Sequence, residues 1–247
     1  MTTAEKTTSR WFSKRTGEEM LMARWGHFGT PVLVFPTAGG DAEEIERMLM
    51  IKVLSPLIAE GRIKVYSIDS VAARNWGDLD VSGQSKASLL DSFQQYVRHE
   101  VVPAIRNDCD DDSVGVVVAG ASIGAFNALS VLCRFPDAFV KAICMSGSFD
   151  VERFMKNLHG PSSEFHLASP LRFLPGLEDG PLLDTLRTRE VVMAHGGGRY
   201  EDPQQDWKMA ALLGQKGVPN RVDSWGEEYD HDWPTWREML PKYLAEL

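Results

Sequence analysis

Short strand-like runs alternate along the chain with longer segments in which apolar residues recur every three or four positions. The strand-like runs cover residues 31–35, 63–68, 114–119, 141–145, 190–195 and 221–225. Several of them, such as 114–119, are almost wholly apolar, which is typical of parallel strands buried on both faces. The helical pattern is clearest at five residues spaced four apart: Leu89, Phe93, Val97, Val101 and Ile105. This spacing predicts one long amphipathic helix.

Turn and cap residues place further elements between these runs. Residues 11–15 and 20–25 flank a Thr-Gly turn and predict an antiparallel hairpin. Asp41, with Glu44 three residues later, is typical of a helix N-cap, and Gly61 marks the expected end of that helix. Additional helices are predicted over residues 122–135, near 204–215 and over 233–247.

The order of these elements predicts the fold class. A hairpin followed by repeated strand–helix units indicates an α/β fold with a mostly parallel central sheet of about eight strands and helices on both faces. No Gly/Ser-rich linker, internal repeat or abrupt change of composition divides the 247 residues. We therefore expect one domain over residues 1–247. Residues 150–189, rich in Pro, Gly and Leu, are expected to form an irregular insertion on its surface.

A candidate nucleophile follows the strand-like run at 114–119. The chain continues Gly120-Ala121-Ser122-Ile123-Gly124, which has the pattern G-x-S-x-G. Between a strand and a helix, this pattern is typical of a sharp turn that exposes the serine hydroxyl, while the small residues let strand and helix approach. Ser122 is therefore the candidate nucleophile. The alternative is a tight turn that holds a serine without function.

A serine hydroxyl needs a general base at neutral pH. Among the six histidines, His231 lies between the last predicted strand and the last predicted helix, where the order nucleophile, acid, histidine places the base. The acid is expected after the strand at 190–195, where Glu201 and Asp202 both lie. We favour Glu201, because Asp202 precedes a proline and could instead cap the next helix. Asp150 is a further alternative.

Two backbone N–H groups are needed to bind the oxyanion of an acyl-transfer reaction, one from the residue after the nucleophile and one from the loop after the third strand. Ile123 supplies the first, and the small residues of 35–41 suit the second. Four side chains or backbone positions are candidates for substrate binding: Thr37, Gly39, Trp76 and Trp233. For Trp233 and its neighbours, packing of the last helix on the sheet is an equally good explanation.

Composition and charge exclude several classes of function. Twenty-six basic and 35 acidic residues give a net charge of −9, which disfavours binding to nucleic acids and to anionic membranes. The three cysteines are widely spaced, which indicates neither a disulfide framework nor a zinc site. No apolar run approaches the length of about 20 residues that a membrane span needs, and residues 1–10 are polar. A cytoplasmic protein is therefore predicted, and a mature secreted form whose leader has been removed is the alternative.

Four segments carry a resemblance to a known family: GASIGAFNAL, FPDAFVKAICMSGSFD, GGGRYED and HDWPTWREMLPKYL. They resemble the esterase D-type family of α/β-hydrolases, which includes S-formylglutathione hydrolases, feruloyl and acetyl esterases and mycolyltransferases. The resemblance runs from about residue 10 to residue 245 and implies the α/β-hydrolase fold. It also implies Ser122 as nucleophile, His231 as base, Glu201 as acid and Ala38 as the donor of the second oxyanion N–H.

These observations together predict a serine carboxylesterase that acts on a small-molecule ester and needs no metal and no organic cofactor. One alternative is an acyltransferase that uses the same triad with an acceptor other than water. Another is a non-catalytic α/β-hydrolase-fold protein that serves as a binding module. The sequence makes no prediction of oligomeric state.

Overall fold

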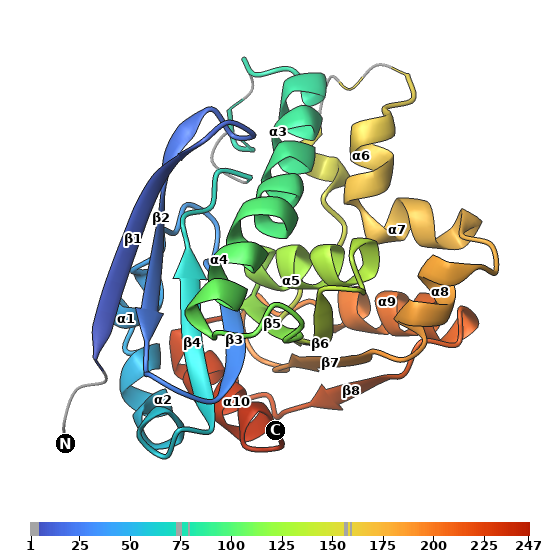
Figure 1. Cartoon of the computed structure of the whole chain (residues 1–247). Coiled ribbons are helices and arrows are strands. Elements are labelled where there is room, and N and C mark those ends of the chain that lie inside the picture. Colours follow the sequence, from blue (N-terminus) through green and yellow to red (C-terminus); the bar gives the residue numbers. More distant parts are fainter. Residues whose placement is uncertain (1–4, 73–75, 79, 156–157, 159) are drawn as a thin grey trace.

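The computed structural model describes residues 5–72, 76–78, 80–155, 158 and 160–247, and these residues form one eight-stranded sheet (Figure 1). The strands are β1 (Lys6–Ser13), β2 (Glu18–Trp25), β3 (Thr30–Phe35), β4 (Ile63–Ile68), β5 (Val116–Ala121), β6 (Phe139–Met145), β7 (Glu190–His195) and β8 (Asn220–Ser224). Their order across the sheet is β1-β2-β4-β3-β5-β6-β7-β8. Strand β2 pairs antiparallel with β1 and with β4, and all other neighbouring strands are parallel. The carboxyl ends of β3 to β8 therefore lie at one edge of the sheet.

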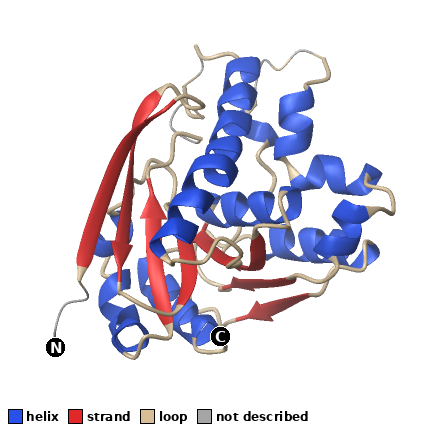
Figure 2. Cartoon of the chain, in the orientation of Figure 1, coloured by secondary structure: helices blue, strands red, loops and turns tan. Residues whose placement is uncertain are grey.

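Helices cover both faces of this sheet (Figure 2). The helices are α1 (Glu44–Arg47), α2 (Met50–Ala59), α3 (Gly83–Tyr96), α4 (Val102–Asp108), α5 (Ile123–Arg134), α6 (Ser163–Ala168), α7 (Pro170–Phe173), α8 (Pro181–Leu186), α9 (Pro203–Gln215) and α10 (Trp233–Leu244). Helices α1, α2 and α10 pack on one face, and the others pack on the opposite face. The predicted fold class, a mostly parallel sheet between two helical layers, is confirmed.

The apolar strands owe their composition to this double cover. In β5, Val116 and Val118 belong to the core under α3 to α9, while Val117 and Ala119 belong to the core under α1, α2 and α10. Because successive side chains point to opposite faces of a sheet, both sets must be apolar. The almost wholly apolar run at 114–119 is therefore explained by the position of β5 in the middle of the sheet.

The predicted long amphipathic helix is present, with one irregularity. Helix α3 continues through a π-helical turn, Val97–Val101, directly into α4. Pro103 stands in the first turn of α4. Proline has no N–H, and in a regular α-helix its ring would clash with the carbonyl of the residue four positions earlier. The residue four positions before Pro103 is His99, which lies inside the π-helical turn rather than in a regular α-helix.

The prediction of one helix that begins at Asp41 is wrong in two respects. It is divided into α1 and α2 at Leu49, whose φ is +63°. Glu44 also does not complete a capping box with Asp41: its carboxylate accepts hydrogen bonds from Thr37 N at 2.7 Å and Thr37 Oγ1 at 2.6 Å. The two donors of the preceding turn compete successfully for this carboxylate, so the helix begins later, at Glu44.

The segment expected to be irregular between residues 150 and 189 contains the short helices α6, α7 and α8. Several of its apolar side chains are buried in the same core as α3 and α5: Phe165, Ala168, Phe173, Leu174, Leu183 and Leu186. Each helix is too brief for an amphipathic repeat to be legible, which is why the sequence pattern missed them. The division into a single domain with a surface insertion stays a prediction.

Candidate active site

Ser122 occupies the turn between β5 and α5. Its φ of 55° and ψ of −119° are rare for any residue other than glycine. The turn is held by two backbone hydrogen bonds, from Ser122 N to Met145 O at 2.9 Å and from Ser148 N to Ser122 O at 3.2 Å. The residue is half-buried, at the carboxyl end of the central strand and the N-terminus of a twelve-residue helix. This is the strained strand-to-helix turn that the pattern G-x-S-x-G predicts, with Ser122 half-buried.

The two glycines of the pattern are required by close backbone contacts. A Cβ on Gly120 would lie 2.3 Å from the carbonyl carbon of Gly124, and a Cβ on Gly124 would lie 2.7 Å from Phe35 O. Both distances are far below van der Waals contact. Helix α5 is therefore packed tightly against its own strand and against the loop that leaves β3, which brings the two proposed oxyanion donors into adjacent turns.

Those donors are the backbone N–H groups of Ile123 and Ala38. Ala38 lies in a turn closed by a hydrogen bond from Gly40 N to Thr37 O at 3.1 Å. Within the part of the chain that the structure describes, neither N–H has a hydrogen-bond acceptor. The Glu44 carboxylate, bound to Thr37 at both its N–H and its hydroxyl, anchors this turn. Free donors on an anchored turn are what an oxyanion site needs.

The structure places Glu201 beside His231. Glu201 Oε2 lies 3.7 Å from His231 Nδ1, and the Glu201 side chain is 1% exposed whereas that of His231 is 21% exposed. The separation suits an ion pair but is too long for a hydrogen bond, and Nδ1 is buried without a hydrogen-bond partner. Among the described residues no hydrogen bond joins the Ser122 hydroxyl to the His231 ring. Catalytic hydrogen bonds are often long before substrate binds.

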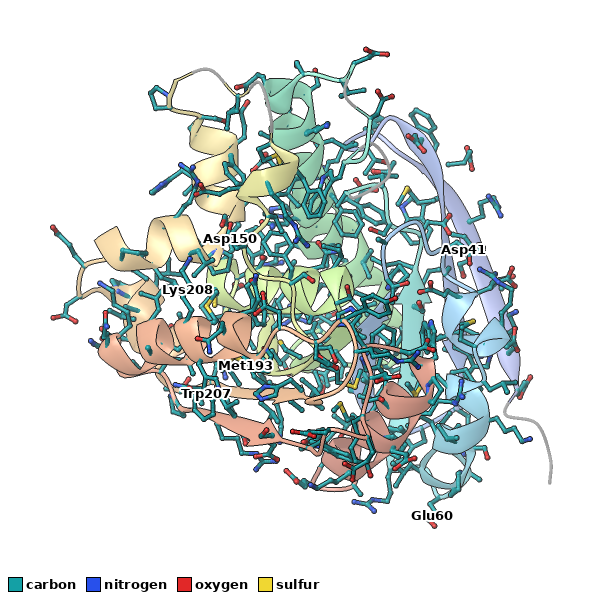
Figure 3. All side chains as sticks on the ribbon, turned by 180° about the vertical axis from the view of Figure 1, so that it is seen from behind. Asp41, Glu60, Asp150, Met193, Trp207 and Lys208 are labelled. Atoms are coloured by element: carbon teal, nitrogen blue, oxygen red, sulfur yellow. The ribbon has the colours of Figure 1, made fainter. Side chains whose placement is uncertain are left out.

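The other two candidate acids have different neighbours. Asp202 is exposed, and its carboxylate accepts a hydrogen bond from the Gln205 side chain at 3.1 Å. Asp150 pairs with Lys208 of α9 at 3.4 Å, on the face shown in Figure 3. Of the three, Glu201 is the carboxylate that contacts His231.

Glycines also pack the loop that carries Glu201 against the loop that carries His231. A Cβ on Gly196 would lie 1.8 Å from Tyr229 O, so no larger residue fits there. Arg199 then clamps the two loops: its N–H, Nε and Nη2 all donate to the Asp230 carboxylate, at 2.7, 2.9 and 2.6 Å. The Arg199 guanidinium lowers the pKa of Asp230. The Gly-Gly-Gly run is thus a contact surface between two loops.

Sequence reasoning missed Ser146, which follows β6. Its hydroxyl donates to Glu201 Oε1 at 2.6 Å and accepts from Trp236 Nε1 at 2.9 Å. The sequence offered only a weak signal, a small polar residue directly after a buried strand. Trp236 is a buried residue that contacts both Ser146 and the His231 ring.

A second buried acid–histidine pair lies next to Glu201. His195, the last residue of β7, and Asp206 of α9 are joined at 2.8 Å between Nδ1 and Oδ2, and both side chains are almost fully buried. Burial raises the pKa of Asp206 from 3.8 to about 6, and the nearby charge of Glu201 adds to the increase. The hydrogen bond with His195 acts in the opposite direction.

Replacing Asp206 with asparagine is expected to flatten the pH dependence of stability. Between pH 3.8 and about 6 the native state holds a proton on Asp206 that the unfolded state has lost, so wild-type stability falls as pH rises through this window. A shift of this size corresponds to at most about 3 kcal/mol. The free energy of unfolding, measured with urea, should fall less between pH 4.5 and pH 7.5 in the variant than in wild type. A difference between the two proteins that does not change with pH would contradict this expectation.

The candidate substrate-binding residues are placed as follows. Thr37 is half-buried, with its hydroxyl bound to Glu44. Gly39 is exposed, and its φ of +75° explains the glycine. Trp76 is 5% exposed and packs against Phe126 and Phe154, with ring centroids 6.0 and 5.1 Å away.

Trp233 begins α10 and packs edge-on against Trp236 at 5.4 Å. Thr37, Trp76 and Trp233 each contact other residues of the protein, and contact of these side chains with a substrate stays a prediction.

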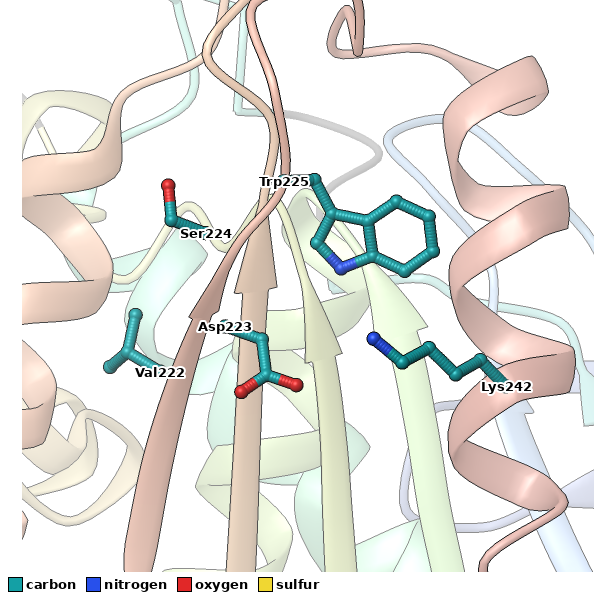
Figure 4. Close-up of a pocket in the computed structure, with 5 residues that line it drawn as sticks. All are labelled: Val222, Asp223, Ser224, Trp225 and Lys242. Carbon is teal, nitrogen blue, oxygen red and sulfur yellow. The ribbon is translucent and has the colours of Figure 1, made fainter.

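One hollow of about 520 Å³ lies at the edge of the sheet, between β8 and α10 (Figure 4). Trp225 and Lys242 line it, with Lys242 Nζ 4.9 Å from the centroid of the Trp225 ring. Trp225 Nε1 donates to the Tyr243 hydroxyl at 2.8 Å. Trp225 therefore packs the last helix onto the sheet.

No group of His, Cys, Asp or Glu side chains in the described ranges has the arrangement of a metal site. In the same ranges no helix is both long enough and apolar enough to cross a membrane.

Comparison with known proteins places the chain among related sequences and folds. The model of the family described as putative esterase matches residues 50–247. A ferulic acid esterase superposes with a TM-score of 0.73 at 15% identity, covering 98% of this chain and 97% of that one. An S-formylglutathione hydrolase from Agrobacterium tumefaciens gives 0.72 at 13% identity, covering 99% and 94%. MPT51 of Mycobacterium tuberculosis gives 0.72 at 14% identity, covering 98% and 97%. No curated protein matches the sequence significantly.

Proposed function

The chain belongs to the putative esterase family, and from this premise we propose that it is a serine carboxylesterase with Ser122, His231 and Glu201 as its catalytic triad. Family membership and the α/β-hydrolase fold support ester hydrolysis as the class of reaction. The residues that carry it are our proposal. A small-molecule ester is the substrate class that the family implies.

One observation carries the proposal: a strained serine lies at the same edge of the sheet as a buried carboxylate that is paired with a histidine. Ser122 follows β5, Glu201 follows β7 and His231 follows β8, and these strands are parallel. Ser122 is linked to the pair through its hydrogen bond to Met145, whose neighbour Ser146 binds Glu201. Strain of this kind costs about 1–3 kcal/mol and is concentrated at functional sites.

The proposed mechanism uses groups of this chain alone. Ser122 Oγ attacks the ester carbonyl carbon while the His231 ring takes the hydroxyl proton, and the N–H groups of Ala38 and Ile123 bind the resulting oxyanion. The tetrahedral intermediate then collapses, the C–O bond to the alcohol breaks, and His231 protonates the departing alcohol. Water repeats the sequence on the acyl-enzyme and releases the acid. Glu201 stabilises the imidazolium in both halves.

Labelling by a fluorophosphonate probe tests this proposal directly. We expect wild-type protein to incorporate one probe per chain on Ser122, mapped by peptide mass spectrometry, and to hydrolyse p-nitrophenyl esters. The Ser122→Ala variant should take up none. The series from acetate to laurate then measures how long an acyl chain the site accepts.

Two results would change the proposal. A folded wild-type protein that incorporates no probe contradicts it and favours the non-catalytic binding module. Labelling of Ser122 and acyl-enzyme formation without release to water favours the acyltransferase alternative, which a panel of added alcohols would then reveal.

A further inference from the structure

Ser146 is held in a backbone conformation that serine seldom adopts. Its φ is +47°, its N–H donates to Ala194 O at 2.7 Å, and the residue is 3% exposed. The left-handed region favours glycine, and holding another residue there strains the backbone. This strain has to be offset by other interactions, and the Ser146 side chain makes two of them.

That side chain joins three separate segments. Trp236 Nε1, from α10, donates to Ser146 Oγ at 2.9 Å, and Ser146 Oγ donates to Glu201 Oε1 at 2.6 Å. An indole nitrogen only donates and an ionised carboxylate only accepts. The hydroxyl hydrogen must therefore point at Glu201, so the direction of this chain of hydrogen bonds is determined by its two ends.

Glu201 depends on this hydroxyl. Within the described ranges, the bond from Ser146 is the one hydrogen bond to the Glu201 carboxylate. The other oxygen, Oε2, is the atom 3.7 Å from His231 Nδ1. Holding Oε1 on Ser146 therefore leaves Oε2 facing the imidazole.

Trp236 also contacts His231, the other member of the acid–base pair. Its ring lies edge-on to His231, with centroids 5.3 Å apart and an interplanar angle of 80°. The same indole thus restricts the imidazole by packing and holds Ser146 by its N–H. Both members of the acid–base pair are positioned by contacts to one serine and one tryptophan.

We propose that Ser146, held by Trp236, is a positioning residue that orients Glu201 toward His231. This inference rests on the proposed esterase function and deepens it. Ser146 contacts no reacting atom: it acts through Glu201, whose carboxylate it keeps in the orientation that stabilises the imidazolium.

Replacing Ser146 with glycine separates positioning from stability. Glycine adopts a positive φ without strain, which offsets the loss of the hydrogen bonds to Glu201 and Trp236, so the thermal midpoint should stay close to that of wild type. Loss of the hydroxyl frees the carboxylate, and kcat per titrated Ser122 should fall about 10- to 100-fold, the scale of a misplaced catalytic group. The matched control is Asp110→Gly, which relieves a similar φ of +52° at an exposed turn after α4 and should leave kcat unchanged.

The pH profile supplies a readout that a merely structural role would not move. A well-placed carboxylate favours the imidazolium, so loosening Glu201 should shift the acid limb of kcat/KM to lower pH. Asp206, the acid next to Glu201, is unchanged in every variant. Trp236→Phe keeps an aromatic ring at this position but replaces the indole with a smaller ring that has no N–H, and should give a smaller change in the same direction.

The outcomes separate this inference from the proposed function. If Ser146→Gly and Trp236→Phe both retain wild-type kcat per active site and an unshifted acid limb, the positioning role is overturned while the esterase proposal stands. If wild-type protein shows no Ser122-dependent hydrolysis, the esterase proposal fails, and the positioning role fails with it.

Discussion

Ser122→Ala is expected to reduce kcat for ester hydrolysis by about 10⁴- to 10⁶-fold, the loss that follows removal of a nucleophile whose triad acts as a unit. The Oγ atom forms the acyl bond in the proposed mechanism, so no neighbouring group replaces it. The measurement is steady-state hydrolysis of the best p-nitrophenyl ester, corrected for spontaneous hydrolysis.

The fold should survive this substitution. The turn at Ser122 is held by backbone bonds to Met145 and Ser148, and no hydrogen bond to the Ser122 hydroxyl occurs in the described part of the chain. Circular dichroism and urea unfolding of the variant should match wild type. Ser122→Gly is a useful companion, because it should be equally inactive and more stable once the strain is relieved. Substantial hydrolysis by a clean preparation of either variant would falsify the assignment of the nucleophile.

Glu201→Gln is expected to reduce kcat by about 10²- to 10⁴-fold, as when the acid of a triad loses its charge but keeps its shape. Glutamine still accepts the hydrogen bond from Ser146 through its amide oxygen, so the loop should keep its position. What is lost is the negative charge beside Nδ1 of His231, which stabilises the imidazolium. The measurement is kcat per fluorophosphonate-titrated site.

Two carboxylates serve as matched controls. Asp202→Asn alters an exposed group that binds Gln205, and Asp150→Asn alters a group paired with Lys208. Each should leave kcat close to wild type, because neither contacts His231. A large loss in Asp202→Asn together with near-normal activity in Glu201→Gln would transfer the role of the acid to Asp202.

The elements that sequence patterns predicted well are those whose environment is uniform along their length. Strands β4 and β7 were predicted with the bounds that the structure has, residues 63–68 and 190–195. A central parallel strand is buried on both faces, so nearly all its residues are apolar and the strand can be recognised from the sequence. The short helices α6 to α8 left no such record, because four to six residues complete too few turns to show a repeat.

Errors arose where a side chain had a choice of partners. Asp41 and Glu44 have the spacing of a capping box, yet Glu44 binds Thr37 instead. The spacing of residues along the chain identifies possible local hydrogen-bond partners. The partner that a side chain binds also depends on groups from other segments that the fold places beside it. Here the turn after β3 presented two donors to one carboxylate.

The sequence by itself determined the parallel α/β sheet and the strained turn that carries Ser122, since both depend on neighbours in the chain and on small residues at fixed spacing. Only the tertiary structure decided that Glu201, rather than Asp202 or Asp150, lies beside His231. It alone revealed Ser146, whose partners Glu201 and Trp236 are 55 and 90 residues away along the chain. Contacts across such separations leave no periodic mark, because they are made by single side chains at loop positions where strands end.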